Sequence, residues 1–272
     1  MKMTSNVHTH SAWCDGNNTL REMADAAIAI GFTDLGFSSH SPTPFDLSYP
    51  NMTDEAGYVR EIAELKEEYA GRLGILCGIE QDCFGPINHD NYDYVIGAVH
   101  YLPLDGGYVS IDSSLRQTGA AAKVYDGGQN MYRKYYSLVY ESAKRFSPDI
   151  IGHFDVIAKY NKGNIYFDET SADYTAAALE ALDGVLDIII PYGGMVELNT
   201  SAFVRGLRDV PYPDPFILKR IAQRGGRVII TTDSHRTSTL NAGFDTALEF
   251  LISSGFKSMA VLRDKKFIDV NI

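Results

Sequence analysis

Six of the seven histidines in this chain lie beside short apolar or β-branched runs, at the places where buried strands end. These histidines are His8, His10, His40, His100, His153 and His235. Helix-like stretches separate the runs, which predicts βα units around a parallel sheet or barrel. Because the carboxyl ends of parallel strands meet on one side of such a fold, the same pattern gathers the six imidazoles there. The chain is therefore expected to adopt an α/β fold with a histidine-rich site at the strand ends.

The predicted elements alternate over nearly the whole length. Helices are expected at 20–30, 53–69, 130–145, 171–190, 214–224 and 241–255. Strands are expected near Val7 and at 33–39, 74–80, 94–100, 150–153, 195–199, 227–232 and 258–263. Thr19 and Thr53 are the expected caps of the first two helices. No composition break or repeat interrupts the pattern, so residues 1–272 are expected to form one domain.

The segment 101–129 does not fit this alternation. It is irregular, contains several glycines and is longer than a normal connection. We expect it to be a functional loop or lid. Arg116 within it is a candidate to close over a substrate, although a solvated loop charge is the simpler interpretation.

Three acidic residues share the placement of the histidines. Glu80 follows an apolar strand, where an ionised carboxylate is costly unless it is paired or bound to a metal. Asp233 lies two residues before His235, so both side chains can project to the same side. Asp15 lies in a turn, where it also fits the role of a turn residue or helix cap. With the histidines, these acids make a polynuclear metal site the best account of the pattern.

The candidate metal ligands are His8, His10, Asp15, His40, Glu80, His100, His153, Asp233 and His235. Imidazole and carboxylate without thiolate suit Zn²⁺, Mn²⁺ or Fe²⁺. The set is too large for one ion. Glu80 could bridge two ions about 3.5–4 Å apart, and the remaining ligands suffice for a third ion. His89, in the polar turn 86–91, is expected to be a surface histidine. The three cysteines are not expected to form a disulfide framework.

The formal charge of −11 and the absence of a basic run argue against nucleic acid or anionic membrane as a partner. Bound divalent cations would still allow an anionic substrate. No stretch approaches the roughly 20 apolar residues of a membrane span, and the N-terminal residues have no apolar signal core. We therefore expect a cytoplasmic protein, either a monomer or a homodimer.

The motifs together resemble those of the PHP (polymerase and histidinol phosphatase) superfamily. They are His8-Thr9-His10-Ser11, Asp15, Ser39-His40-Ser41, Gly78-Ile79-Glu80, Gly97-Ala98-Val99-His100, Gly152-His153-Phe154-Asp155 and Thr232-Asp233-Ser234-His235. The Gly-Ala-Val-His motif and the run Glu197-Leu198-Asn199-Thr200-Ser201 are most similar to the histidinol-phosphate phosphatase branch.

This resemblance implies a distorted (β/α)7 TIM-like barrel with three divalent metal ions at the C-terminal ends of the strands. The first metal would take His8, His10, Glu80 and Asp233. The second would share Glu80 and take His100 and His153. The third would take Asp15, His40 and His235. Some superfamily members have a histidine in place of Asp15, which bears on the metal preferred at the third position.

The resemblance also implies residues that bind phosphate or transfer protons. Arg205 and Lys159 stand where the family carries phosphate-binding basic residues, and Arg208 and Arg236 are possible substitutes. The candidate catalytic acids are Asp15, Glu80, Asp155 and Asp233, of which Asp15 and Asp155 are candidate proton donors to the leaving group.

The implied reaction is hydrolysis of L-histidinol phosphate to L-histidinol and phosphate. A hydroxide activated by the three metals would attack phosphorus, and the surrounding charges would stabilise the transition state. Alternatives are an enzyme for another small phosphomonoester or a nucleotide, and one for the 3′ end of a nucleic acid. A metal-dependent amidohydrolase is a further alternative, but the chain has no obvious candidate for its carboxylated lysine. A non-catalytic metal-binding protein is the last.

Overall fold

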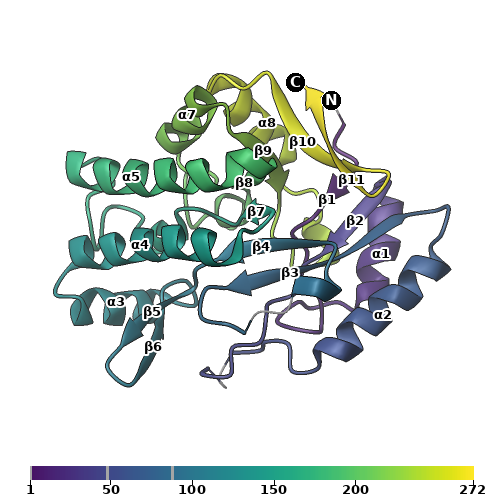
Figure 1. The fold of residues 1–272 in the computed structure, drawn as a ribbon, viewed down its shortest axis with the longest axis horizontal. Helices are drawn as coiled ribbons and strands as arrows, with labels where there is room; N and C mark the ends of the chain where they lie inside the picture. The colour runs from purple at the N-terminus through teal and green to yellow at the C-terminus, as the bar shows by residue number, and fades with distance from the viewer. Residues whose placement is uncertain (1, 47–48, 87–88) are drawn as a thin grey trace.

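The computed structural model of the protein describes residues 2–46, 49–86 and 89–272 (Figure 1). Residues 87 and 88 of the expected turn 86–91 lie outside this range. Its strands are β1 (Ser5–Asn6), β2 (Asp34–Phe37), β3 (Gly74–Asp82), β4 (Tyr94–Ala98), β5 (Tyr101–Leu104), β6 (Gly107–Ser110), β7 (Ile150–Ile151), β8 (Met195–Asn199), β9 (Arg227–Thr231), β10 (Ser258–Arg263) and β11 (Lys266–Asn271). Its α-helices are α1 (Leu20–Ala29), α2 (Glu55–Glu68), α3 (Leu115–Val124), α4 (Gly128–Phe146), α5 (Ala172–Ile189), α6 (Ser201–Val204), α7 (Pro215–Arg224) and α8 (Phe244–Ser253). Short 3₁₀ helices are η1 (His89–Asn91), η2 (Val156–Ala158), η3 (Ile190–Tyr192) and η4 (Thr237–Thr239).

The main sheet contains nine strands in the order β1-β2-β3-β4-β7-β8-β9-β10-β11. All neighbouring pairs are parallel except β10 with β11, which form an antiparallel hairpin. The helices lie outside the sheet in Figure 1, with α4 and α5 side by side. This arrangement confirms the predicted βα alternation and sends the carboxyl ends of eight parallel strands to one side.

The sheet curls around one buried apolar cluster. Its members are Val7, Leu76, Tyr94, Ile96, Ile150, Met195, Ile229, Ala260 and Leu262. Val7 directly follows β1 and Ala260 and Leu262 lie on β10, so the two ends of the parallel strand order approach each other. A larger apolar cluster joins the outer helices to the sheet. The fold is thus a mixed α/β fold with a curled half-barrel sheet of nine strands, and the predicted seven-stranded count is not confirmed.

Tyr94 crosses the interior of the curled sheet. Its hydroxyl donates to the carbonyl oxygens of Val7 and, at 3.0 Å, Phe37. A Cβ atom at Gly78 would lie 2.2 Å from Cζ of Tyr94, and one at Gly36 would lie 2.4 Å from its hydroxyl oxygen. Only glycine fits at these two positions. The phenol therefore ties β1 and β2 together directly beneath the strand ends that carry the histidines.

Local signals account for the helix starts. Thr19 caps α1 as expected, in a reciprocal capping box with Glu22. The expected cap at Thr53 is wrong, because Asp54 directly precedes the first helical residue. Its carboxylate accepts a hydrogen bond from the N–H of Gly57 at 2.9 Å.

The prediction of an irregular segment at 101–129 is wrong. Strands β5 and β6 form an antiparallel hairpin through Asp105 and Gly106, whose φ of +82° suits glycine. Helix α3 follows, and the side chain of Ser114 caps it. The Asp-Gly pair and the serine cap are signals that the irregular composition obscured. Arg116 is exposed on α3. We call residues 101–124 the excursion.

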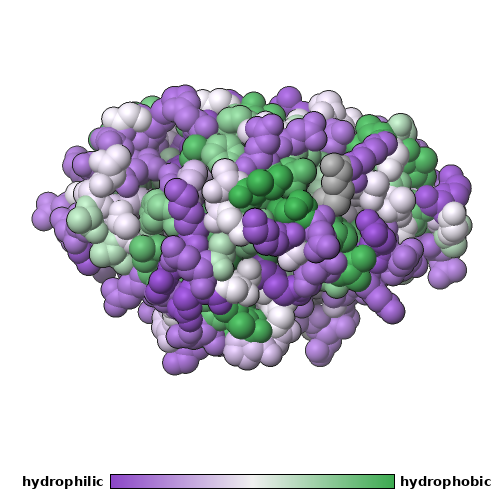
Figure 2. Space-filling model, turned by 90° about the horizontal axis from the view of Figure 1, so that it is seen from above, coloured by the Kyte–Doolittle hydropathy of each residue, from purple (hydrophilic) through white to green (hydrophobic). Residues whose placement is uncertain are grey.

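The polar surface and the unpaired cysteines are the remaining features of the fold. Figure 2 shows hydrophilic residues over much of one face, with hydrophobic patches between them. Cys14, Cys77 and Cys83 are all free, as expected. Among the described residues, no helix combines the length and apolar character needed to cross a membrane.

Candidate metal centre

The strand ends open into a cavity of about 420 Å³, a size typical of small-molecule sites. Seven of the nine predicted ligands line it: Asp15, His40, Glu80, His100, His153, Asp233 and His235. The other two, His8 and His10, follow β1 and are fully buried. All nine therefore belong to one site, although they come from distant parts of the chain.

Glu80, near the end of β3, lies at the centre of this site. Its side chain is fully buried, and its two oxygens face different histidines. Oε1 lies 2.8 Å from Nε2 of His153 and 3.1 Å from Nε2 of His100. Oε2 lies near His8 at 3.4 Å, His10 at 3.5 Å and His40 at 2.8 Å. A carboxylate shared in this way has the geometry expected of a bridging ligand.

Asp233 follows β9 and faces the histidine pair after β1. Its Oδ1 lies 3.0 Å from Nε2 of His10 and 3.7 Å from Nε2 of His8. The φ of Asp233 is +48°, a left-handed conformation that aspartate tolerates better than most residues. This turn aims Asp233 inward while His235 also reaches the site, as the two-residue spacing predicts.

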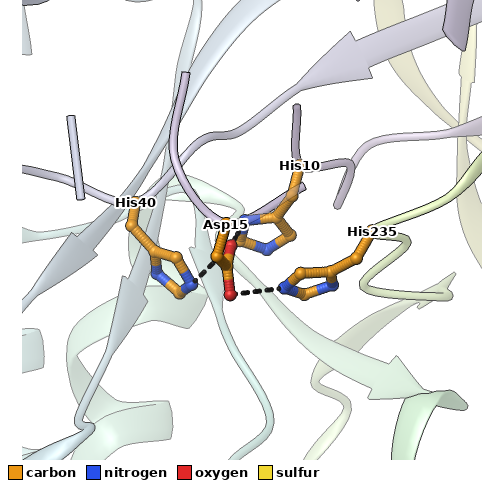
Figure 3. Close-up of side chains that lie close together, drawn as sticks. All are labelled: His10, Asp15, His40 and His235. Atoms are coloured by element: carbon orange, nitrogen blue, oxygen red, sulfur yellow. Dashed lines mark hydrogen bonds and ion pairs between the residues drawn. The ribbon is translucent and has the colours of Figure 1, made fainter. Parts of the chain in front are cut away.

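Asp15 holds a third group together, shown in Figure 3. Its Oδ2 lies 3.1 Å from Nε2 of His235, and its Oδ1 lies 3.6 Å from Nε2 of His40. His10 joins this group, with Nδ1 also 3.6 Å from Oδ1, whereas the sequence assigned His10 to the first metal alone. The hydroxyl of Tyr49 donates to Oδ2 of Asp15 at 2.6 Å.

Several of these buried atoms make no well-aligned hydrogen bond, although opposite charges lie close to them. They are Nε2 of His8, Nε2 of His10, Oδ1 of Asp15 and Oε2 of Glu80. Buried polar atoms are nearly always satisfied, so such a concentration needs an explanation. The ligand atoms also form four groups, each within 4.8 Å, that could hold an ion. Imidazole nitrogens and carboxylate oxygens at this spacing fit divalent cations.

The charges at the site stabilise one another when no cation is bound. Burial opposes ionisation of Glu80, but His40, His100 and His8 bring its pKa well below the usual range. Burial likewise opposes protonation of His8, but Glu197, Asp233 and Glu80 hold its pKa well above the ordinary value. Divalent cations would replace these protons as the positive partners of the carboxylates.

Two buried carboxylates that the sequence analysis missed orient the histidines. Glu197 on β8 accepts from Nδ1 of His8 at 2.5 Å and from the N–H of His153 at 2.6 Å. Asp82 lies 3.3 Å from Nδ1 of His100. Such contacts fix the ring orientation of ligating histidines. A signal existed for both, because each carboxylate lies in an apolar strand, as Glu80 does.

The cavity lining also carries charged side chains besides the ligands. Arg205, Lys159 and Arg236 all belong to it. Nζ of Lys159 lies 3.3 Å from Oδ2 of Asp112, a residue of the excursion that no sequence motif indicated. Burial opposes ionisation of Asp112, but Lys159 and nearby histidines lower its pKa, so it is a carboxylate at neutral pH.

Asp155 and Arg208 are not part of this lining. Neither belongs to the residues that line the cavity. Asp155 is buried 3.5 Å from Arg208 and accepts from the N–H of Asp214 at 3.1 Å. Burial raises the pKa of Asp155 to about 7 despite the guanidinium. Arg208 also pairs with Glu169 at 3.2 Å. Arg208, a possible substitute for the phosphate-binding residues, therefore pairs with internal carboxylates and does not line the cavity.

His89 lies outside the site, as expected, but it is not fully solvated. It belongs to η1, ahead of β4, and its ring packs 5.9 Å from the ring of Phe146. It is partly buried, and burial lowers its pKa. The polar residues around His89 in the sequence gave no sign of its contact with Phe146. This contact forms only when α4 packs beside η1.

Residues 6–201 match the PHP domain family. The histidinol-phosphatase of Bacillus subtilis is 24% identical over 89% of this chain and 97% of its own length. A "probable histidinol-phosphatase" of Deinococcus radiodurans is 28% identical over 93% of this chain and 94% of its own. The crystal structure of histidinol phosphate phosphatase from Lactococcus lactis, complexed with zinc, L-histidinol and phosphate, has a TM-score of 0.72 and 21% identity, covering 97% of this chain and 98% of that one. The family match alone spans well over half of the sequence, and the protein therefore belongs to the PHP domain family.

Proposed function

We propose that this protein is a metal-dependent phosphomonoester hydrolase that converts L-histidinol phosphate to L-histidinol and phosphate. The observation that carries the proposal is the set of buried ligand atoms around Glu80 that make no well-aligned hydrogen bond, in a cavity whose lining also carries basic residues. The full-length similarity to histidinol-phosphatases supports the choice of substrate.

We assign the metal sites as follows. His8, His10, Glu80 and Asp233 hold one divalent ion; Glu80, His100 and His153 hold a second; Asp15, His40 and His235 hold a third. Divalent cations in these positions would neutralise phosphate charge and lower the pKa of a bound water. The ligand chemistry suits zinc, manganese or iron.

The chain's own residues bind and orient the phosphoester. Arg205 and Lys159 line the cavity and would hold the phosphate oxygens, and Arg236 lines it as well. Arg205 can grip two oxygens, whereas Lys159 acts as a point charge. Asp15 faces the cavity. Burial opposes its ionisation, but His40, His235 and His10 hold its pKa well below the usual range, so it would serve as a metal ligand rather than as the proton donor. We do not assign that role to Asp155, because it lies behind the cavity wall.

We also propose that one domain contains the whole chain and that seven strands frame the barrel. The strands β1 to β4 and β7 to β9 follow one another in parallel. A bridge between Thr9 and Ser234, just beyond β1 and β9, joins the two ends. In this view β10 and β11 are additions to a seven-stranded frame.

The test is phosphate release by protein loaded in turn with Mn²⁺, Zn²⁺ and Fe²⁺, using a panel of phosphoesters that includes L-histidinol phosphate. We expect L-histidinol phosphate to be turned over fastest, and His100→Ala to abolish turnover. His89→Ala is the matched control, because it removes the histidine that lies outside the site. Equal rates on a generic phosphoester would exclude the substrate assignment, and an active His100→Ala variant would exclude the metal mechanism.

A further inference from the structure

The proposed substrate carries two opposite charges, a phosphate and an ammonium. The ammonium is separated from the ester oxygen by two carbon atoms, so it must lie close to the metal centre when the phosphate is bound. The cations and basic residues account for the phosphate. A carboxylate near the ligands would suit the ammonium, because a charge brought into a partly buried site is costly unless an opposite charge lies beside it.

The acidic residues that line the cavity are Asp15, Glu80, Asp112 and Asp233. Three of these belong to the candidate metal groups, where cations would take up their charge. Asp112 belongs to none of those groups. It is thus the carboxylate of the cavity lining that remains available for an organic cation.

The surroundings of Asp112 suit this role. Its side chain is 19% exposed, so it is reachable from the cavity yet partly desolvated. Ser110 donates to Oδ1 at 3.2 Å and fixes the carboxylate, while Lys159 lies 3.3 Å from Oδ2. The lysine ammonium thus occupies the position that an amine ligand would take. A charge-assisted pair of this kind is stronger than one between neutral groups.

We propose that Asp112 receives the ammonium of the substrate and thereby selects phosphoesters with an amine near the ester. This inference rests on the proposed function and names the part of the site that recognises the amine. Lys159 and Asp112 neutralise each other in the free protein. The substrate brings one charge for each of them, since its phosphate attracts Lys159 and its ammonium replaces the lysine at Asp112.

The test measures binding rather than turnover, so that it stands apart from the phosphatase assay. Calorimetry on the metal-loaded protein would compare L-histidinol with the same alcohol in which hydrogen replaces the amino group. We expect the wild type to prefer L-histidinol by about tenfold or more, as a hydrogen bond between charged groups implies. In Asp112→Asn this ratio should fall close to one.

Two further variants isolate the cause. Asp105→Asn removes the same charge from the exposed hairpin turn of the excursion and should keep the preference. Lys159→Met removes the competing ammonium and should raise the preference above that of the wild type. It keeps the inference testable if Asp112→Asn does not fold.

The outcomes separate the two proposals. A wild-type ratio near one, or a ratio unchanged in Asp112→Asn, overturns the inference whatever the phosphatase assay shows. A preference for L-histidinol that depends on Asp112 in a protein without phosphatase activity supports the inference and excludes the proposed reaction. If Asp112→Asn weakens only the binding of inorganic phosphate, Asp112 serves Lys159 and the inference is wrong.

Discussion

At the residue scale, the site depends on one carboxylate whose two oxygens contact different histidines. Oε1 of Glu80 faces His100 and His153, and Oε2 faces His40 and the histidines after β1. A buried carboxylate with no cation nearby would be strongly destabilising. Here the imidazoles supply positive charge when they are protonated, and divalent cations would supply it when they are bound.

Metal binding should release protons. The pKa of His8 is raised above its ordinary value of 6.5, and the pKa of His10 is raised as well. Protons therefore compete with cations below the raised pKa values, and the apparent metal affinity should rise with pH. Calorimetry in buffers of different ionisation enthalpy would count the released protons. If the apparent metal affinity did not change between about pH 6 and about pH 9, the assignment of His8 and His10 as ligands would be wrong.

The raised pKa of His8 also affects the metal-free protein, whose stability should fall as the pH rises. Because the folded-state pKa of His8 is raised, its contribution to stability is complete below about pH 6.5 and is lost as the pH rises through the raised value. Urea unfolding of chelated protein over a pH series would measure this loss.

Glu197 should control metal affinity without being a ligand. Glu197→Gln keeps the size of the side chain but weakens its hold on His8 and on the backbone of His153. We expect about a 10- to 100-fold loss of metal affinity, as changes at such supporting contacts typically cause. Metal content after dialysis against a buffered metal solution would measure it. Glu249→Gln on the exposed face of α8 is the control, and equal metal content in the two variants would count against the role.

At the element scale, the central tyrosine sets how the strand ends of β1 and β2 are held. Gly78→Ala would place a methyl group against the ring of Tyr94. We expect a loss of about 1–3 kcal/mol in the free energy of unfolding, because the packed interior has no room to relax. Gly107→Ala is the control, since no atom lies within 4 Å of a Cβ at that position on β6. Urea unfolding would measure the stability of both variants. Similar midpoints would show that the interior accommodates the added methyl group at Gly78 without loss of stability.

The excursion shows how an element can belong to the site without a recognisable motif. The sequence predicts an irregular functional loop or lid over residues 101–129, yet residues 101–124 form a hairpin and a helix with an Asp-Gly turn and a serine cap. Its contribution to the cavity comes from Asp112 and Ser113, which follow β6. The hairpin and the helix hold these residues at a defined place in the cavity lining, near the ligand histidines.

At the scale of the whole molecule, bound metal should stabilise the fold. The candidate ligands come from segments between residues 8 and 235, so ions at the site would link the ends of β1, β2, β3, β4, β7 and β9. Ligands that bind only the folded state stabilise it by mass action, by about 4 kcal/mol when the free metal exceeds the dissociation constant about a thousandfold. Chelation should therefore lower the melting temperature, as calorimetry would show, and readdition of Zn²⁺ or Mn²⁺ should restore it. Identical melting curves before and after chelation would mean that no structural link depends on metal.

The sequence by itself determined the α/β alternation, most helix positions and the identity of the nine candidate ligands. It could do so because hydrophobic periodicity is local and because a charged or imidazole side chain after an apolar run is conspicuous. It also pointed to the family through motifs that keep their order along the chain. Tertiary structure alone decided how the sheet curls, that Glu197 and Asp82 orient the histidines, and that Asp155 and Arg208 face each other rather than the cavity. These outcomes depend on which distant side chains meet when the strands pack. Tertiary structure also decided the role of Asp112, because only the folded chain brings it into the cavity lining beside Lys159.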